Sequence, residues 1–98
     1  MNINKTINGS NLTLAPEGRL DTITAPELEA VLKESLTDVK ELIFDFESLE
    51  YISSAGLRVL LSAQKIMNKQ GAMRILNVND VIMEIFEVTG FSDILTIE

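Results

Sequence analysis

Three consecutive patterns in the middle of the chain restrict its fold more than any other feature. Residues 42–46 form a short apolar run between charged residues, which indicates a buried strand. From Leu57 onward, apolar residues recur at helical spacing, and the helix that they predict is apolar enough to be largely buried. Ser53 and Ser54 lie in between, in a predicted loop that begins at Tyr51, where either side-chain oxygen can cap the first helical turn. The sequence therefore predicts a strand, a loop with two hydroxyl groups and a buried helix in direct succession.

The N-terminal part of the chain has the pattern of a β-hairpin. Apolar and polar residues alternate over residues 3–7 and again over residues 12–14, and Asn8-Gly9 between them tolerates the positive φ angles of a tight turn. Pro16 lacks an N–H group for a ladder, so we expect it at an unpaired edge or a bulge, with the strand resuming over residues 18–20.

A first helix is predicted over about residues 25–35. Thr24 and Glu27 have the spacing of a capping box, and Pro26 is tolerated in a first turn because its missing N–H would have no partner there. Leu28 and Leu32 then belong to an apolar face, while the acidic residues between them stay in water.

The C-terminal part predicts one more strand and one more helix. Gly71 is expected to end the second helix in the left-handed conformation, and residues 73–78 read as a strand. Asp80 can cap a third helix that ends at Gly90, and residues 94–97 are a last strand or a docking segment. A hairpin followed by βαβα units predicts an α/β fold with a mixed sheet, parallel later strands, right-handed crossovers and helices packed on the sheet.

Composition excludes most catalytic and metal chemistry. The 98 residues suit one domain, residues 1–98, and contain neither cysteine nor histidine, which argues against disulfides, Ser-His-Asp hydrolysis and a zinc site. Ile52 stands where a nucleophile elbow carries its first glycine, and the chain has no glycine-rich phosphate loop. We therefore expect that the chain is not an enzyme, that it has no catalytic residue, and that it binds neither a metal nor a cofactor.

Charge limits the class of partner. A net charge of -7 opposes binding to nucleic acid or to anionic membranes, and favours a protein partner or a small ligand. The first residues are not apolar enough for a signal peptide, and no run approaches membrane-spanning length, so we expect a cytoplasmic protein without membrane insertion.

Two motifs and the order of elements resemble a known family over nearly the whole chain. Gly18-Arg19-Leu20-Asp21 and Tyr51-Ile52-Ser53-Ser54-Ala55-Gly56-Leu57 resemble the STAS-domain family, and within it the free-standing anti-sigma factor antagonists of bacteria. In that group, an Asp-Ser-Ser/Thr-Gly-Leu turn opens a helix, and its first serine is phosphorylated by a partner that is both kinase and anti-sigma factor. The resemblance places this serine at Ser54 and puts Asp21 beside it in the partner-binding surface.

Three positions depart from the best-known members of that group. Ser53 stands where they carry the aspartate, Ala55 replaces their second Ser or Thr, and Arg58 replaces a common glycine. Ser53 is therefore an alternative phosphoacceptor. Arg58 adds a cation that can pair with a carboxylate of the partner or with a nearby phosphate.

The resemblance implies a binding module that is switched by phosphorylation. Unmodified, it would dock on an anti-sigma factor with serine kinase activity and so release a sigma factor, and a serine phosphatase would reset it. The partner-binding residues that we expect are Asp21, Ser53, Ser54, Ala55, Gly56, Leu57 and Arg58. The alternative is a STAS subunit or ligand-sensing module of a membrane transport complex, in which a small nucleotide could bind at the same helix start.

Overall fold

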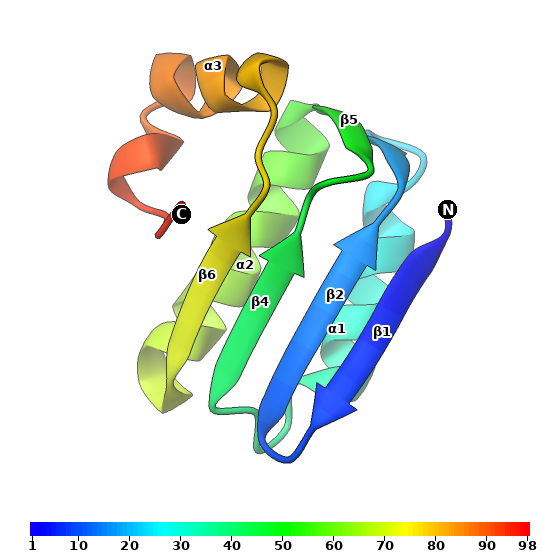
Figure 1. Ribbon diagram of the computed structural model, residues 1–98, viewed down its shortest axis with the longest axis vertical. Coiled ribbons are helices and arrows are strands. Elements are labelled where there is room, and N and C mark those ends of the chain that lie inside the picture. Colours follow the sequence, from blue (N-terminus) through cyan, green and yellow to red (C-terminus); the bar gives the residue numbers. More distant parts are fainter.

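The computed structural model describes all 98 residues, arranged as a sheet with helices on one side (Figure 1). The elements in chain order are β1 (Ile3–Asn8), β2 (Asn11–Pro16), β3 (Gly18–Leu20), α1 (Ala25–Ser35), β4 (Glu41–Asp45), β5 (Leu49–Ile52), α2 (Ser54–Gln70), β6 (Ala72–Leu76), α3 (Asp80–Thr89) and a 3-10 turn (Phe91–Asp93).

The main sheet has the strand order β1-β2-β4-β6. β1 and β2 form the predicted antiparallel hairpin, and Gly9 at its turn has a φ of 64°. β4 pairs in parallel with β2 on one side and with β6 on the other, in a register that places Leu42 beside Leu12 and Met73. The predicted mixed sheet with parallel later strands is confirmed. Pro16 lies at the end of β2, where it faces Ile3 across the hairpin.

Helices α1 and α2 cover one face of this sheet and lie behind it in Figure 1. Leu42 and Phe44 of β4 point toward them and are fully buried, whereas Ile43 between them is half-buried on the open face. From α2, Leu60 and Met67 complete the core without any exposed surface. The one-sided burial explains the alternation in β4, because a strand that is covered by helices on one face buries every second residue.

A second, two-stranded sheet was not predicted. β5, whose last two residues belong to the loop that we predicted from Tyr51 onward, pairs in parallel with β3, so that Leu20 lies opposite Ile52. Leu49 and Ile52 are buried, but Glu50 is exposed and Tyr51 half-buried. This strand was missed because its two buried residues are three positions apart, which is not the period of a strand.

The bounds of α1 were predicted correctly, but its capping box is wrong. Thr24 has helical backbone angles and makes no side-chain cap. Its hydroxyl instead contacts the carbonyl of Arg19, and Glu27 binds the amino group of Met1 at 2.9 Å.

Two other helix ends also differ from the prediction. Gly71 is extended, with a φ of 176°, and a Cβ at this position would collide with the backbone of Lys40. Asn79 rather than Asp80 caps α3, and its side chain accepts a 2.8 Å hydrogen bond from the N–H of Ile82. Gly90 ends α3 as predicted, and it does so in the left-handed conformation, with a φ of 82°.

The C-terminal segment docks on the core and does not form a full strand. Ile97 makes a single parallel bridge to Ile75, and the side chain of Leu95 is buried. In length and hydropathy, every helix falls short of what a membrane crossing requires.

Candidate functional site

The start of α2 is held directly against β3. Ser53 is the N-cap residue, with extended backbone angles, and its N–H donates a 2.8 Å hydrogen bond to the carbonyl of Leu20. Its own carbonyl accepts the first helical bond, from Leu57, at 2.9 Å. Because Leu20 precedes Asp21, these bonds bring the two motifs that the sequence singled out into one site.

The two adjacent serines differ sharply in exposure. The Ser53 hydroxyl is buried and has no hydrogen-bond partner, whereas Ser54, the first residue of α2, is exposed. The prediction that one of them caps the helix is wrong, since neither side chain accepts a bond from the first turn. The first N–H groups of α2, which lack intrahelical partners as in any helix, therefore have no side-chain cap.

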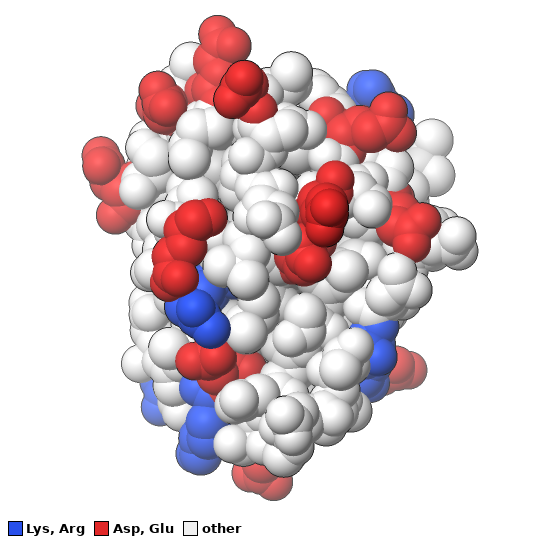
Figure 2. All heavy atoms as spheres, viewed as in Figure 1, with Lys and Arg blue, Asp and Glu red and all other residues white.

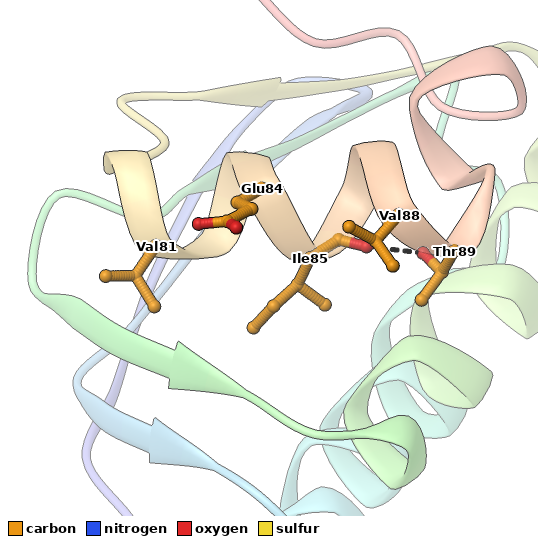
Figure 3. Close-up of a pocket in the computed structure, with 5 residues that line it drawn as sticks. All are labelled: Val81, Glu84, Ile85, Val88 and Thr89. Atoms are coloured by element: carbon orange, nitrogen blue, oxygen red, sulfur yellow. Dashed lines mark hydrogen bonds between the residues drawn. The ribbon is translucent and has the colours of Figure 1, made fainter.

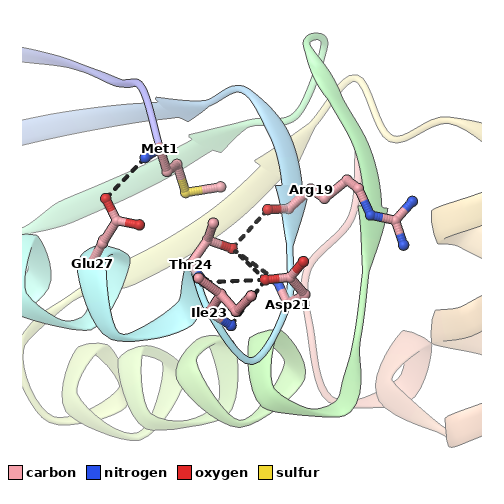
Figure 4. Close-up of polar contacts among 6 residues, drawn as sticks. All are labelled: Met1, Arg19, Asp21, Ile23, Thr24 and Glu27. Atoms are coloured by element: carbon pink, nitrogen blue, oxygen red, sulfur yellow. Dashed lines mark hydrogen bonds and ion pairs between the residues drawn. The ribbon is translucent and has the colours of Figure 1, made fainter.

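Asp21 organises the loop between β3 and α1 (Figure 4). Its Oδ1 accepts hydrogen bonds from the N–H groups of Ile23 at 3.0 Å and Thr24 at 3.1 Å. The Thr24 hydroxyl accepts a 2.9 Å bond from the N–H of Asp21 and donates to the carbonyl of Arg19 at 2.7 Å. The half-buried carboxylate thus fixes the backbone of the loop that carries it.

These contacts also lower the pKa of Asp21. The largest cause is the hydrogen bond from the backbone of Thr24, and the N–H of Ile23, the Thr24 hydroxyl and the charge of Arg19 add to it, while partial desolvation opposes the shift. A carboxylate that accepts backbone N–H bonds is stabilised in its charged form. Asp21 is therefore negatively charged at neutral pH.

The expected partner-binding residues of α2 divide into two layers. Arg58 is exposed and Ala55 is half-buried, whereas Gly56 and Leu57 are buried. A Cβ on Gly56 would lie only 2.7 Å from Cγ1 of Ile52 and 2.8 Å from Cγ of Leu20. Gly56 and Leu57 therefore support the surface from beneath, and the absence of a side chain at Gly56 lets α2 approach β3 and β5 closely.

A groove joins the starts of α1 and α2 next to Ser54. It has a volume of about 360 Å³, and its lining includes Ala55 and Arg58 from α2 and Thr22 from the Asp21 loop. Arg58 forms no ion pair within the chain. The groove thus offers a concave contact surface with a free cation in its wall.

Sequence reasoning missed two features of this site. The side chain of Ile23 is 82% exposed beside Asp21, and the guanidinium of Arg19 lies 4.4 Å from the ring centroid of Tyr51. The exposure of Ile23 could have been suspected from the sequence, because it is a lone isoleucine between two threonines in a polar loop. The second required knowing that β3 and β5 are neighbours.

The comparisons with known proteins agree with this geometry. The sequence model of the STAS domain matches residues 2–98. The anti-sigma-B factor antagonist of Staphylococcus aureus is 32% identical over 97 residues, which cover 97% of this chain and 90% of that protein.

Solved structures share the fold. An anti-sigma factor antagonist from Mycobacterium paratuberculosis has a TM-score of 0.88 at 18% identity, covering 98% of this chain and 83% of that one. SpoIIAA in its unphosphorylated form has a TM-score of 0.78 at 17% identity, covering 99% of this chain and 87% of that one. The phosphorylated form of Bacillus SpoIIAA has a TM-score of 0.77 at 17% identity and covers 99% and 91%. The fold of residues 2–98, the match to the family and the similarity to the staphylococcal protein lead to one assignment: the chain belongs to the STAS-domain family and, within it, to the anti-sigma factor antagonists.

Proposed function

We propose that this antagonist is switched by phosphorylation of Ser54. In the unmodified state it docks on an anti-sigma factor with serine kinase activity and thereby releases a sigma factor. The observation that carries the proposal is the contrast between the two serines, because a kinase can reach the exposed Ser54 and not the buried hydroxyl of Ser53. A helix N-terminus also favours added negative charge.

The docking surface combines the Asp21 loop with the first turn of α2. Asp21 and Ile23 contribute a fixed carboxylate and an exposed apolar side chain, and Ala55 and Arg58 line the neighbouring groove. Arginine is enriched among the residues that dominate the binding energy of protein interfaces, and burial of an exposed apolar side chain adds to affinity, so Arg58 and Ile23 are the contacts on which affinity should depend most. Gly56 and Leu57 keep the surface in place from below.

Phosphate on Ser54 would act on the complex rather than on the fold. It adds about -1.5 to -2 units of charge to the surface that the partner covers. The first turn of α2 has no acidic residue and no side-chain cap, so the chain itself tolerates the new charge. In the complex the phosphate must be desolvated and meets the partner's acidic groups, which should weaken binding by about 1–3 kcal/mol.

In this scheme the chain is a substrate of the kinase and of the phosphatase, and a ligand of the anti-sigma factor. The partner kinase transfers the phosphate and a serine phosphatase removes it, both in the cytoplasm. The alternative role in a membrane transport complex has less support, because the relative with 32% identity over nearly the whole chain is an anti-sigma factor antagonist.

Labelling with the cognate kinase tests the acceptor. We expect incorporation of phosphate from ATP into the wild type and into Ser53→Ala, and none into Ser54→Ala, with the site mapped by mass spectrometry. Undiminished labelling of Ser54→Ala would refute the assignment to Ser54, and loss of labelling in Ser53→Ala alone would transfer it to Ser53.

Binding of a charge mimic tests the switch. Ser54→Asp should bind the anti-sigma factor more weakly than the wild type in isothermal titration calorimetry, and Ser54→Ala should bind about as tightly as the wild type. Equal affinities for Ser54→Asp and the wild type would contradict the mechanism of charge and desolvation.

A further inference from the structure

Helix α3 is apolar on two faces, and only one of them belongs to the core. Ile82 and Phe86 point inward and have no exposed surface. On the outer side, Val81 is 54% exposed and Val88 80% exposed, with the half-buried Ile85 between them (Figure 3). These three residues are spaced i, i+4 and i+7, so they form one continuous stripe along the helix.

This outer stripe borders a shallow hollow. The hollow has a volume of about 310 Å³, and its five lining residues are Val81, Glu84, Ile85, Val88 and Thr89. None of them lines the groove beside Ser54. The stripe is therefore a second surface, separate from the proposed docking surface. Its two ends, Val81 and Val88, are exposed and lie outside the core, and Ile85 between them is half-buried and packs against the core.

The charges on α3 itself and on the chain after β6 have a single sign. Asp80, Glu84 and Glu87 occupy the neighbouring stripe of α3, and residues 75–98 contain no lysine or arginine. The last cation before α3, Arg74, is held by ion pairs with Glu41 and Glu98. In Figure 2 the spheres over α3 include red ones and no blue ones.

We propose that the outer face of α3, formed by Val81, Ile85 and Val88 with the acidic stripe beside them, binds a basic amphipathic helix of a partner protein. An apolar stripe at helical spacing accepts the apolar face of another helix, and the acidic rim selects lysines or arginines at its border. A second copy of this chain is the less favourable occupant. A symmetric contact between two copies places the same acidic stripe on both sides, where like charges oppose each other.

A designed peptide tests the surface. The probe is an amphipathic helical peptide of leucine and lysine, and a peptide with glutamate in place of lysine is the charge control; binding to the full chain is followed by fluorescence anisotropy. We expect the leucine–lysine peptide to bind and the leucine–glutamate peptide not to bind. Absence of binding by the first peptide, or equal binding by both, would overturn the proposal.

Substitution of Val88 tests whether the leucine–lysine peptide binds at the apolar stripe or is only attracted by the negative charge of the whole chain. Val88→Glu adds one more acid, so attraction by charge alone would tighten binding of the leucine–lysine peptide. If the stripe is the site, binding weakens by about tenfold instead, because an apolar contact is lost. Ile7→Glu is the matched control, since Ile7 is 64% exposed on the edge strand β1, away from α3 in Figure 1, and should not weaken binding.

Two further results would overturn the proposal. One is equal or tighter binding of the peptide by Val88→Glu. The other is a concentration-dependent dimer of the wild type in sedimentation experiments that Val88→Glu abolishes, because a second copy would then be the occupant. Circular dichroism of Val88→Glu is expected to match the wild type, since the side chain is 80% exposed.

Discussion

Substituting Gly56 by alanine should destabilise the chain, although alanine is the better helix former. The added Cβ would lie 2.7 Å from Cγ1 of Ile52 and 2.8 Å from Cγ of Leu20, and neither of these side chains has any exposed surface into which it could move. Ile52 ends β5 and Leu20 ends β3, so the overlap falls where both strands meet the start of α2.

The net effect is a difference between two opposing terms. Overpacking a well-packed core typically destabilises by about 1–3 kcal/mol. Replacing glycine inside a helix by alanine contributes about 1 kcal/mol in the opposite direction. We therefore expect Gly56→Ala to lower the free energy of unfolding by about 1 kcal/mol, and to weaken the complex with the anti-sigma factor because the first turn of α2 must shift.

Urea denaturation measures this difference. Ser62→Ala, at an exposed position of the same helix, is a control for helix propensity and should be neutral or slightly stabilising. Gly71→Ala should be more damaging than Gly56→Ala, because its Cβ would meet the backbone of Lys40 rather than side chains. If Gly56→Ala were instead more stable than the wild type by about 1 kcal/mol, the value for propensity alone, the close packing inferred at this position would be wrong.

Three other substitutions address the docking surface. Ile23→Ser should weaken binding of the anti-sigma factor by about tenfold in calorimetry, with unfolding changed by less than about 0.5 kcal/mol, and unchanged affinity would remove Ile23 from the interface. Arg58→Gln should raise the second pKa of phosphorylated Ser54 in phosphorus NMR, because a cation four residues along the helix favours the dianion; an equal pKa would exclude the pairing. Asp21 has a lowered pKa in the folded state, so its stabilising effect is present above about pH 4 and is lost as the pH falls through the folded pKa. Asp21→Asn should therefore lose less stability on acidification than the wild type, and parallel acid unfolding curves would contradict this.

The sequence predicted the elements whose patterns are regular and missed those that depend on neighbours. The alternation of apolar and polar residues was sufficient to predict the hairpin, and the helical spacing of apolar residues was sufficient to predict α1. β5 was missed because its buried residues, Leu49 and Ile52, are placed by β3 rather than by a period of their own. The failed capping box has a local cause, since the Thr24 hydroxyl bonds to the N–H of Asp21 and to the carbonyl of Arg19 in the preceding loop and not to the first turn of α1.

The candidate site was predicted in outline, but its two serines could not be separated from sequence. Adjacent residues at a helix start point about 100° apart, so one of them can face the core and the other the solvent. Which one does so depends on the residue at which α2 begins. The bond from Ser53 N–H to the carbonyl of Leu20 sets that start, and it joins two segments that are distant in the chain.

The missing cap at this helix start leads to a prediction about the phosphorylated chain itself. Where the best-known antagonists carry an aspartate, this chain has Ser53, whose buried hydroxyl makes no hydrogen bond, and the first turn of α2 contains no acidic residue. A phosphate on Ser54 would be the first negative charge at these free N–H groups, and a charge in this place typically stabilises a helix by about 0.3–1 kcal/mol. We therefore expect the phosphorylated chain to unfold at a higher temperature than the unmodified chain. The difference between the two unfolding temperatures should become smaller at high salt. A lower unfolding temperature would mean that phosphate disrupts the helix start, and weaker binding to the anti-sigma factor would then reflect local unfolding instead of charge at an intact surface.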